Sequence, residues 1–138
     1  MSPYREVEHT ADWALHVWAP TLAELFVDAA RGMYALSGAQ VTASSASVQR
    51  TIEARADHDY EVLLVSWLQE LLYLTESENL VFADFQVERL TPDHLRATVA
   101  GAPSSRPDAT RVIKAVTYHD LTLRQTEAGY AVTLVFDV

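Results

Sequence analysis

The stretch YEVLLVSWLQELL, residues 60–72, carries the clearest periodic pattern in the chain. Its large apolar side chains recur every three or four residues, which is the spacing of one face of an α-helix. They are Tyr60, Leu63, Leu64, Trp67, Leu68, Leu71 and Leu72. We therefore expect a helix that forms the main core element, begins at a cap on Asp57 or Asp59, and uses its aromatic residues for packing.

A second amphipathic helix is expected over residues 21–37. Thr21 and Glu24 have the spacing of a capping box, in which a hydroxyl and a carboxylate satisfy the free N–H groups of a helix start. Apolar residues then follow at helical spacing, and Gly38 is suited to end the helix. They are Leu22, Leu25, Phe26, Ala29 and Met33.

Alternating apolar and polar residues predict strands elsewhere in the chain. Thr91-Pro92-Asp93 separates two such runs and predicts a hairpin, whereas the Pro- and Ser-rich residues 101–110 predict a loop. The expected strands cover residues 4–8, 13–19, 48–56, 80–90, 94–101, 111–119, 121–126 and 129–138. This series favours an α+β fold, a two-layer sandwich with two main helices packed on one face of a mostly antiparallel or mixed sheet.

Length and composition place the chain among compact globular proteins. The 138 residues, of which 49% are hydrophobic, suit a single domain over 1–138 with a substantial core. The chain has no Cys, so reactions that need a thiolate and disulfide frameworks are excluded. Neither an export signal nor an apolar run long enough to span a membrane is visible, so we expect a cytoplasmic protein.

The charge balance limits the classes of partner. With 19 acidic and 10 basic residues the formal net charge is −9, and the basic residues are scattered along the chain. Nucleic-acid surfaces need grouped basic residues, so we expect no independent tight binding of RNA or DNA. The same charge favours hard cations or a partner with a basic cleft.

The usual catalytic motifs are absent from the sequence. It has no Gly-rich phosphate loop, no G-x-S-x-G elbow and no H-E-x-x-H zinc motif. Binding of a hard cation through oxygen atoms remains open.

Acidic groups gather at the end of the sequence GYAVTLVFDV. Strand alternation places Tyr130, Val132, Leu134 and Phe136 on one face and Val135 and Asp137 on the other. The Asp137 carboxylate next to Val138 would concentrate negative charge, which Ca²⁺ or Mg²⁺ could compensate. The alternative is a solvated, frayed terminus.

Two further polar positions precede this strand. Lys114 interrupts an apolar run, so its ammonium group either points to solvent or pairs with a carboxylate on a neighbouring strand. His119 and Asp120 follow and suit an ordinary turn.

Three motifs together resemble the archease family across nearly the whole chain: HTAD at 9–12, IKAVTYH at 113–119 and FDV at 136–138. The segments around them, together with the central SWLQELLYLTESENLVFADFQV, occur in the same order as in that family. The resemblance implies an α+β fold. It also implies a non-catalytic accessory protein that promotes guanylylation and multiple turnover of an RtcB-type tRNA-splicing RNA ligase.

The resemblance further implies a metal site. Its ligands would be Asp12, Asp137 and Val138, the last through backbone or terminal oxygens, with Asp12 brought next to Asp137 by pairing of the first and last strands. The ion would be Ca²⁺ or Mg²⁺, with Mn²⁺ as a further choice. Lys114 matches a position linked to activity in the family. His9 of HTAD and His119 of IKAVTYH are further activity-linked candidates. We expect His9 to hold the local turn, because a hard cation prefers oxygen ligands.

One segment departs from the family pattern. Many members carry Gly-Glu and a His in the loop before IKAVTYH, whereas here Ala102 follows Gly101 and no His is present.

Two other functional classes remain possible for this sequence. The first is a metal-dependent enzyme in which Asp12 and Asp137 hold the cation and Lys114 or His119 acts in acid–base catalysis. The second is a chaperone-like modulator of tRNA-modifying enzymes such as methyltransferases.

Overall fold

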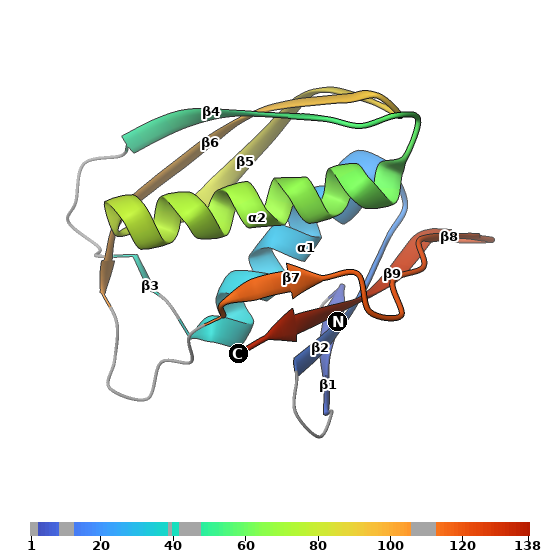
Figure 1. Cartoon of the computed structure of the whole chain (residues 1–138), viewed down its shortest axis with the longest axis horizontal. Coiled ribbons are helices and arrows are strands. Elements are labelled where there is room, and N and C mark those ends of the chain that lie inside the picture. Colours follow the sequence, from blue (N-terminus) through green and yellow to red (C-terminus); the bar gives the residue numbers. More distant parts are fainter. Residues whose placement is uncertain (1–2, 9–12, 39, 42–47, 106–112) are drawn as a thin grey trace.

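The computed structural model describes residues 3–8, 13–38, 40–41, 48–105 and 113–138. These residues form two helices and nine strands (Figure 1). In chain order they are β1 (Tyr4–Glu8), β2 (Trp13–Ala19), α1 (Leu22–Ser37), β3 (Gln40–Val41), β4 (Val48–Arg55), α2 (Tyr60–Glu78), β5 (Leu80–Thr91), β6 (His94–Ser105), β7 (Ala115–Thr117), β8 (Arg124–Thr126) and β9 (Gly129–Asp137).

The strands form two antiparallel sheets. The first has the order β1-β2-β9-β7, with β8 also paired to β9, and the second joins β4, β6 and β5, with β3 paired to the end of β6. The expected α+β class is confirmed. The strands, however, divide between two sheets where the sequence pattern predicted one.

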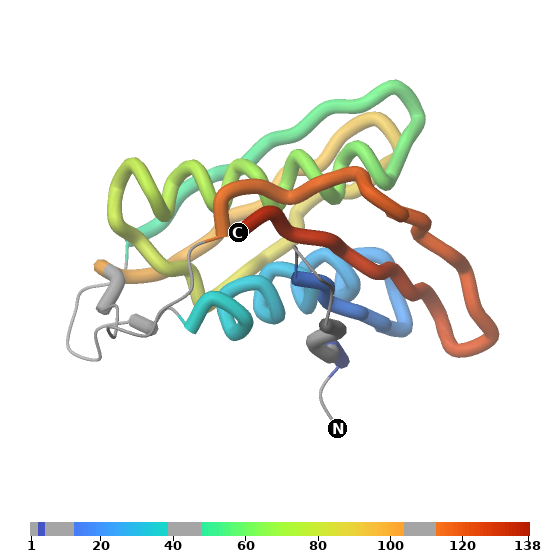
Figure 2. The backbone as a smooth tube through the Cα atoms, turned by 60° about the horizontal axis from the view of Figure 1, so that its bottom comes forward, coloured from blue at the N-terminus to red at the C-terminus, as the bar shows by residue number. Residues whose placement is uncertain are grey.

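Both helices pack against both sheets. α1 contacts β1, β2 and β9 of the first sheet and β5 of the second, whereas α2 contacts β7 of the first and β4, β5 and β6 of the second. Figure 1 shows α2 between the β4–β6 group and the pair β7 and β9, and the same arrangement is visible from a second direction in Figure 2. Neither helix in the described part of the chain is long and apolar enough to cross a membrane.

Local capping fixes the start of both helices and the end of α1, as the sequence predicted. The Glu24 N–H donates to Thr21 Oγ1 at 3.2 Å, and Gly38 ends α1 with a φ of 73°. Of the two candidate caps for α2, Asp59 is the one used: its Oδ1 accepts from the Glu61 and Val62 N–H groups at 2.9 and 3.2 Å. These contacts satisfy N–H groups that the helix itself leaves unpaired.

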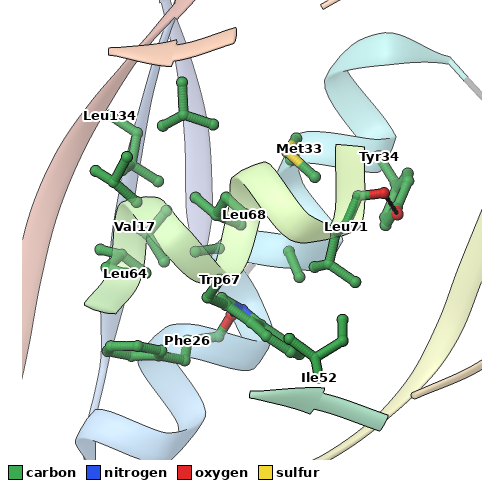
Figure 3. Close-up of a cluster of buried hydrophobic side chains, with 14 of the residues drawn as sticks. Val17, Phe26, Met33, Tyr34, Ile52, Leu64, Trp67, Leu68, Leu71 and Leu134 are labelled. Atoms are coloured by element: carbon green, nitrogen blue, oxygen red, sulfur yellow. Dashed lines mark hydrogen bonds between the residues drawn. The ribbon is translucent and has the colours of Figure 1, made fainter. Parts of the chain in front are cut away.

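The core lies between the helices and the sheets, with Trp67 at its centre (Figure 3). Trp67 is fully buried, and its Nε1–H donates to the Phe26 carbonyl oxygen at 2.9 Å, which links α2 to α1. The buried Tyr34 hydroxyl lies 2.8 Å from Thr75 Oγ1 and makes a second link between the helices. The predicted packing role of Trp67 is therefore confirmed.

Three segment predictions need correction. The loop expected at 101–110 is wrong over 101–105, where β6 continues because Pro103 pairs with Leu80 and Ser105 pairs with Gln40. This pairing overrides the turn-forming composition. Residues 106–110 lie outside the described residues.

Within the described residues 113–126, the strands expected at 111–119 and 121–126 are shorter and cover β7 and β8, while residues 111–112 lie outside the described residues. Tyr118 accepts from the Leu121 N–H and so closes a turn after β7. Leu123 donates to Glu61 Oε2 at 2.6 Å, so its N–H bonds to α2.

Candidate functional site

The candidate site lies where β2, β9 and β7 meet. In the first sheet Trp13 pairs with Phe136, and Ala115 pairs with Asp137. The Lys114 N–H extends the second pairing, because it donates to the Asp137 carbonyl oxygen at 2.7 Å. Segments from the two ends and the late middle of the sequence therefore meet at one end of this sheet.

The Asp137 side chain lies at the surface, at the end of β9. Val132, Leu134 and Phe136 are completely buried against the core, and Asp137 after them is exposed. Val138 is half-buried and packs against the core cluster. Asp137 is therefore exposed, but Val135 on the same face of β9 is buried at 1% exposure, so alternation alone does not explain the exposure of Asp137, the last residue of the strand.

Asp12 and His9 lie outside the described residues. Trp13, the covalent neighbour of Asp12, is described and pairs with Phe136, the covalent neighbour of Asp137. This register places the residue that follows the HTAD motif opposite the residue that precedes Asp137.

The Lys114 side chain is exposed. None of the ion pairs among the described residues involves it. Of the two predictions for Lys114, the solvent-facing side chain is therefore the one that the structure supports. A backbone bond to Asp137 and an exposed ammonium group leave its charge available to a ligand or partner.

His119 lies in the turn that follows β7. Its side chain is exposed, and Nε2 lies 3.2 Å from Asp120 Oδ2, while Asp120 has a φ of 53°. The His119 N–H donates to Thr117 Oγ1 at 3.2 Å, and that hydroxyl donates to the Val135 carbonyl oxygen at 3.0 Å. Thr117 thus ties this turn to β9, a role that its sequence position gave no reason to predict.

The atoms at this site that could bind a metal ion, among the described residues, are oxygen atoms. Among the described residues no group of three or more His, Asp or Glu side chains is close enough to hold a metal ion. Asp137 supplies one exposed carboxylate, and Val138 adds backbone oxygen beside it. Such donors suit Ca²⁺ or Mg²⁺, and a second carboxylate would have to come from elsewhere in the chain.

Comparison with known proteins places this arrangement in a family. The model of the archease protein family matches residues 4–138. The archease of Methanosarcina mazei is 36% identical over 142 residues, covering 98% of this chain and 95% of that protein. The archease of Methanopyrus kandleri is 33% identical and covers 99% of each.

Solved structures show the same fold. The solution structure of protein 1598 from Methanobacterium thermoautotrophicum superimposes with a TM-score of 0.74 at 24% identity, covering 100% of both chains. The crystal structure of an archease and possible chaperone from Thermotoga maritima gives 0.68 at 20% identity, covering 97% of this chain and 96% of that one. The family model and the relatives above 30% identity agree over nearly the full length, and the chain belongs to the archease family.

Proposed function

We propose that this protein is a non-catalytic, metal-binding activator of an RtcB-type RNA ligase, which promotes GTP-dependent guanylylation of the ligase during tRNA splicing or RNA repair. The observation that carries the proposal is the register at the end of the first sheet. It brings Asp137, Lys114 and the neighbour of Asp12 together at one end of that sheet.

The proposed metal ligands are Asp12, Asp137 and Val138. If the β2–β9 ladder continued by one residue beyond Trp13 and Phe136, Asp12 would oppose Asp137. Two carboxylates in such positions repel each other unless a cation lies between them. A hard divalent ion fits this set of oxygen donors, with Ca²⁺, Mg²⁺ and Mn²⁺ as the candidates. The ion would supply charge compensation and hold these groups in one geometry.

The net charge of the chain supports a protein partner with a basic surface. The net charge of −9 suits association with a basic nucleotide- and RNA-binding cleft. Lys114 adds an exposed cation beside Asp137, and a cation there could contact the phosphates of bound GTP. The accessory protein would bind the guanylylation-competent state of the ligase more tightly than other states, and so raise its population.

The decisive test is reconstitution with a cognate RtcB-type ligase, GTP and Mn²⁺. Wild type should accelerate guanylylation, whereas Asp12→Ala, Asp137→Asn and Lys114→Ala should lose most of that acceleration. Glu127→Gln is a matched control, because Glu127 is an exposed carboxylate in the turn at the opposite end of β9. Circular dichroism checks that each variant is folded. No acceleration by wild type would sink the proposal.

Metal binding is tested separately by calorimetric titration with each of the three ions. Asp137→Asn should weaken binding at least tenfold, and Glu127→Gln should leave it unchanged. Turnover of RNA or nucleotide by the protein alone would instead favour a metal-dependent enzyme. Recovery of a tRNA methyltransferase, without a ligase, in pull-downs would favour a modulator of tRNA modification.

A further inference from the structure

Two tyrosine side chains are exposed where the structure gives no reason for an aromatic residue. Tyr73 is 65% exposed and Tyr118 is 57% exposed, and they are the two exposed large hydrophobic side chains in the described part of the chain. No hydrogen bond or ring contact among the described residues involves either phenol group. Packing among the described residues therefore does not explain them.

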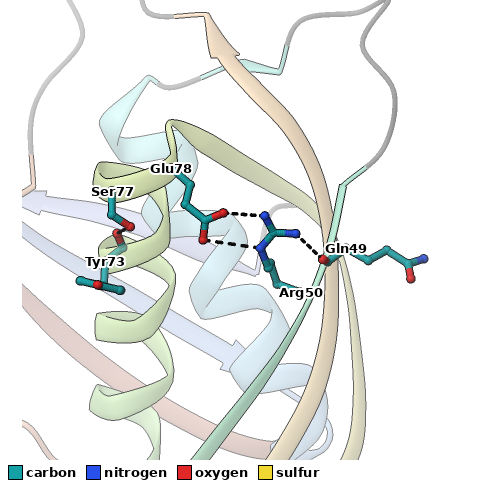
Figure 4. Close-up of polar contacts among 5 residues, drawn as sticks. All are labelled: Gln49, Arg50, Tyr73, Ser77 and Glu78. Atoms are coloured by element: carbon teal, nitrogen blue, oxygen red, sulfur yellow. Dashed lines mark hydrogen bonds and ion pairs between the residues drawn. The ribbon is translucent and has the colours of Figure 1, made fainter.

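Both tyrosines border the contact between α2 and β7. Gln69 Nε2–H donates to the Val116 carbonyl oxygen at 3.4 Å, so the face of α2 that carries Gln69 is turned toward β7. Tyr73 is one helical turn further on the same face. Figure 4 shows it projecting from the side of α2 away from β4 and Arg50. Tyr118 follows Val116 by two residues.

The direction of the two elements sets the spacing of the rings. α2 and β7 run in opposite directions (Figure 1), so Tyr73 and Tyr118 lie on opposite sides of the Gln69 contact. One helical turn is about 5–6 Å and two strand residues are about 7 Å, so the pair spans roughly 12 Å. We call Tyr73, Gln69 and Tyr118 the tyrosine surface.

This surface is continuous with the candidate site. Lys114 directly precedes β7 and Tyr118 directly follows it, so the three residues of the strand separate them. Lys114 also bonds to Asp137 through its backbone. Exposed Glu70, Glu76 and Asp120 flank the tyrosines and make the surrounding surface acidic.

We infer that the tyrosine surface is where the protein docks on the basic rim of the ligase's active-site cleft, an inference that rests on the proposed function. Tyrosine is enriched at interface hot spots because it buries a large ring at small entropic cost and keeps a polar hydroxyl. The acidic flanks complement a rim that binds RNA phosphates. The tyrosines supply affinity, and Asp137 and Lys114 act in activation after docking.

The test separates affinity from activation. Guanylylation is measured over a range of accessory-protein concentrations for wild type, Tyr73→Ala, Tyr118→Ala and the double variant. We expect the double variant to need at least tenfold more protein for half-maximal activation and to reach the wild-type plateau. Asp137→Asn should lower the plateau instead.

Matched control variants show whether a change in activation is due to loss of the tyrosine rings. Tyr73→Phe and Tyr118→Phe keep the rings and should stay within about twofold of wild type, since most of the buried area is retained. Thr51→Ala changes an exposed residue of β4 and should have no effect. Direct binding to the ligase, followed by biolayer interferometry, should weaken in parallel with activation.

The outcomes distinguish the two proposals. If wild type activates and the double variant keeps the wild-type half-maximal concentration, or lowers only the plateau, the docking inference is wrong and the proposed function stands. If wild type does not activate the ligase at any concentration, both are wrong.

Discussion

The interior around α2 and the end of the first sheet around Asp137 differ in how their polar groups are satisfied. In the interior, Trp67 and Tyr34 are buried and each places its polar atom on a partner within the protein. At the sheet end, Asp137 and Lys114 expose charged side chains for which the described residues supply no ion pair. Stability therefore resides mainly in the first region, and the second can serve a partner without a large cost in stability.

Trp67→Ala tests this contrast with the largest expected change in stability. Removing a fully buried Trp that bonds to Phe26 should lower the free energy of unfolding by about 3–5 kcal/mol. Urea unfolding followed by circular dichroism measures the loss. Trp67→Phe, which keeps a ring, should lose less. A loss below about 1 kcal/mol for the alanine variant would mean that this helix is not the centre of the core.

Tyr34→Phe should have a smaller effect that depends on pH. At neutral pH it should cost about 1–3 kcal/mol, because the buried Thr75 hydroxyl loses its 2.8 Å partner. Burial raises the pKa of Tyr34, and this outweighs the lowering by hydrogen bonds from Thr75 and the Phe82 backbone. In the unfolded chain the pKa of tyrosine is about 10.

The sign of the pH effect follows from these two states. Below pH 10 the phenol is neutral in both, and the stability is fully present. As the pH rises above 10 only the unfolded state ionises, so stability falls. In Tyr34→Phe the decline between pH 9 and 11 should be shallower than in wild type. Equal slopes would show that Tyr34 ionises freely in the folded protein.

Asp59→Ala should cost about 1 kcal/mol, within a range of roughly 0.5–2, because the first N–H groups of α2 lose their acceptor. Thermal unfolding provides the measurement. Asp59→Asn keeps an acceptor oxygen and should retain most of the stability. An alanine variant as stable as wild type would show that packing alone fixes the start of α2.

The smallest changes in stability are expected at exposed charges. Arg50 donates to Glu78 from Nη2 at 2.5 Å (Figure 4), and this bond lowers the pKa of Glu78. Both groups are open to solvent, so Arg50→Ala should not measurably change unfolding. Lys114→Ala should change it by less than about 0.5 kcal/mol. The two variants should differ in function, because only the lysine variant should lose ligase activation.

The helices and the central hairpin could be predicted because their signals are local. Caps at Thr21 and Asp59, the apolar stripe around Trp67 and the turn at Pro92 and Asp93 each act within a few residues. The division into two sheets could not be predicted, since pairings such as Ile52 with Ala97 join residues far apart in sequence. The pairing of Trp13 with Phe136 agrees with what the family resemblance implied for the first and last strands. No short-range pattern encodes such a choice of neighbour.

The candidate site was predictable only in part. Alternation along β9 predicted Asp137 on the face opposite Phe136, and Asp137 is exposed, although Val135 on the same face is buried. The backbone bond from Lys114 to Asp137 and the contact between Gln69 and Val116 needed the tertiary fold, because each joins two elements that no local pattern relates. The roles of His9 and Asp12 remain predictions from the sequence, because both residues lie outside the described residues.

The position of β9 between β2 and β7 has a consequence for synthesis of the chain. β1 and β2 leave the ribosome first, but the edge of β2 that β9 occupies stays unpaired until more than a hundred further residues have been added. At typical elongation rates this takes on the order of 10 s. During that time an open strand edge is available to other nascent chains or to chaperones. The last strand to emerge thus closes the sheet that the first two strands begin.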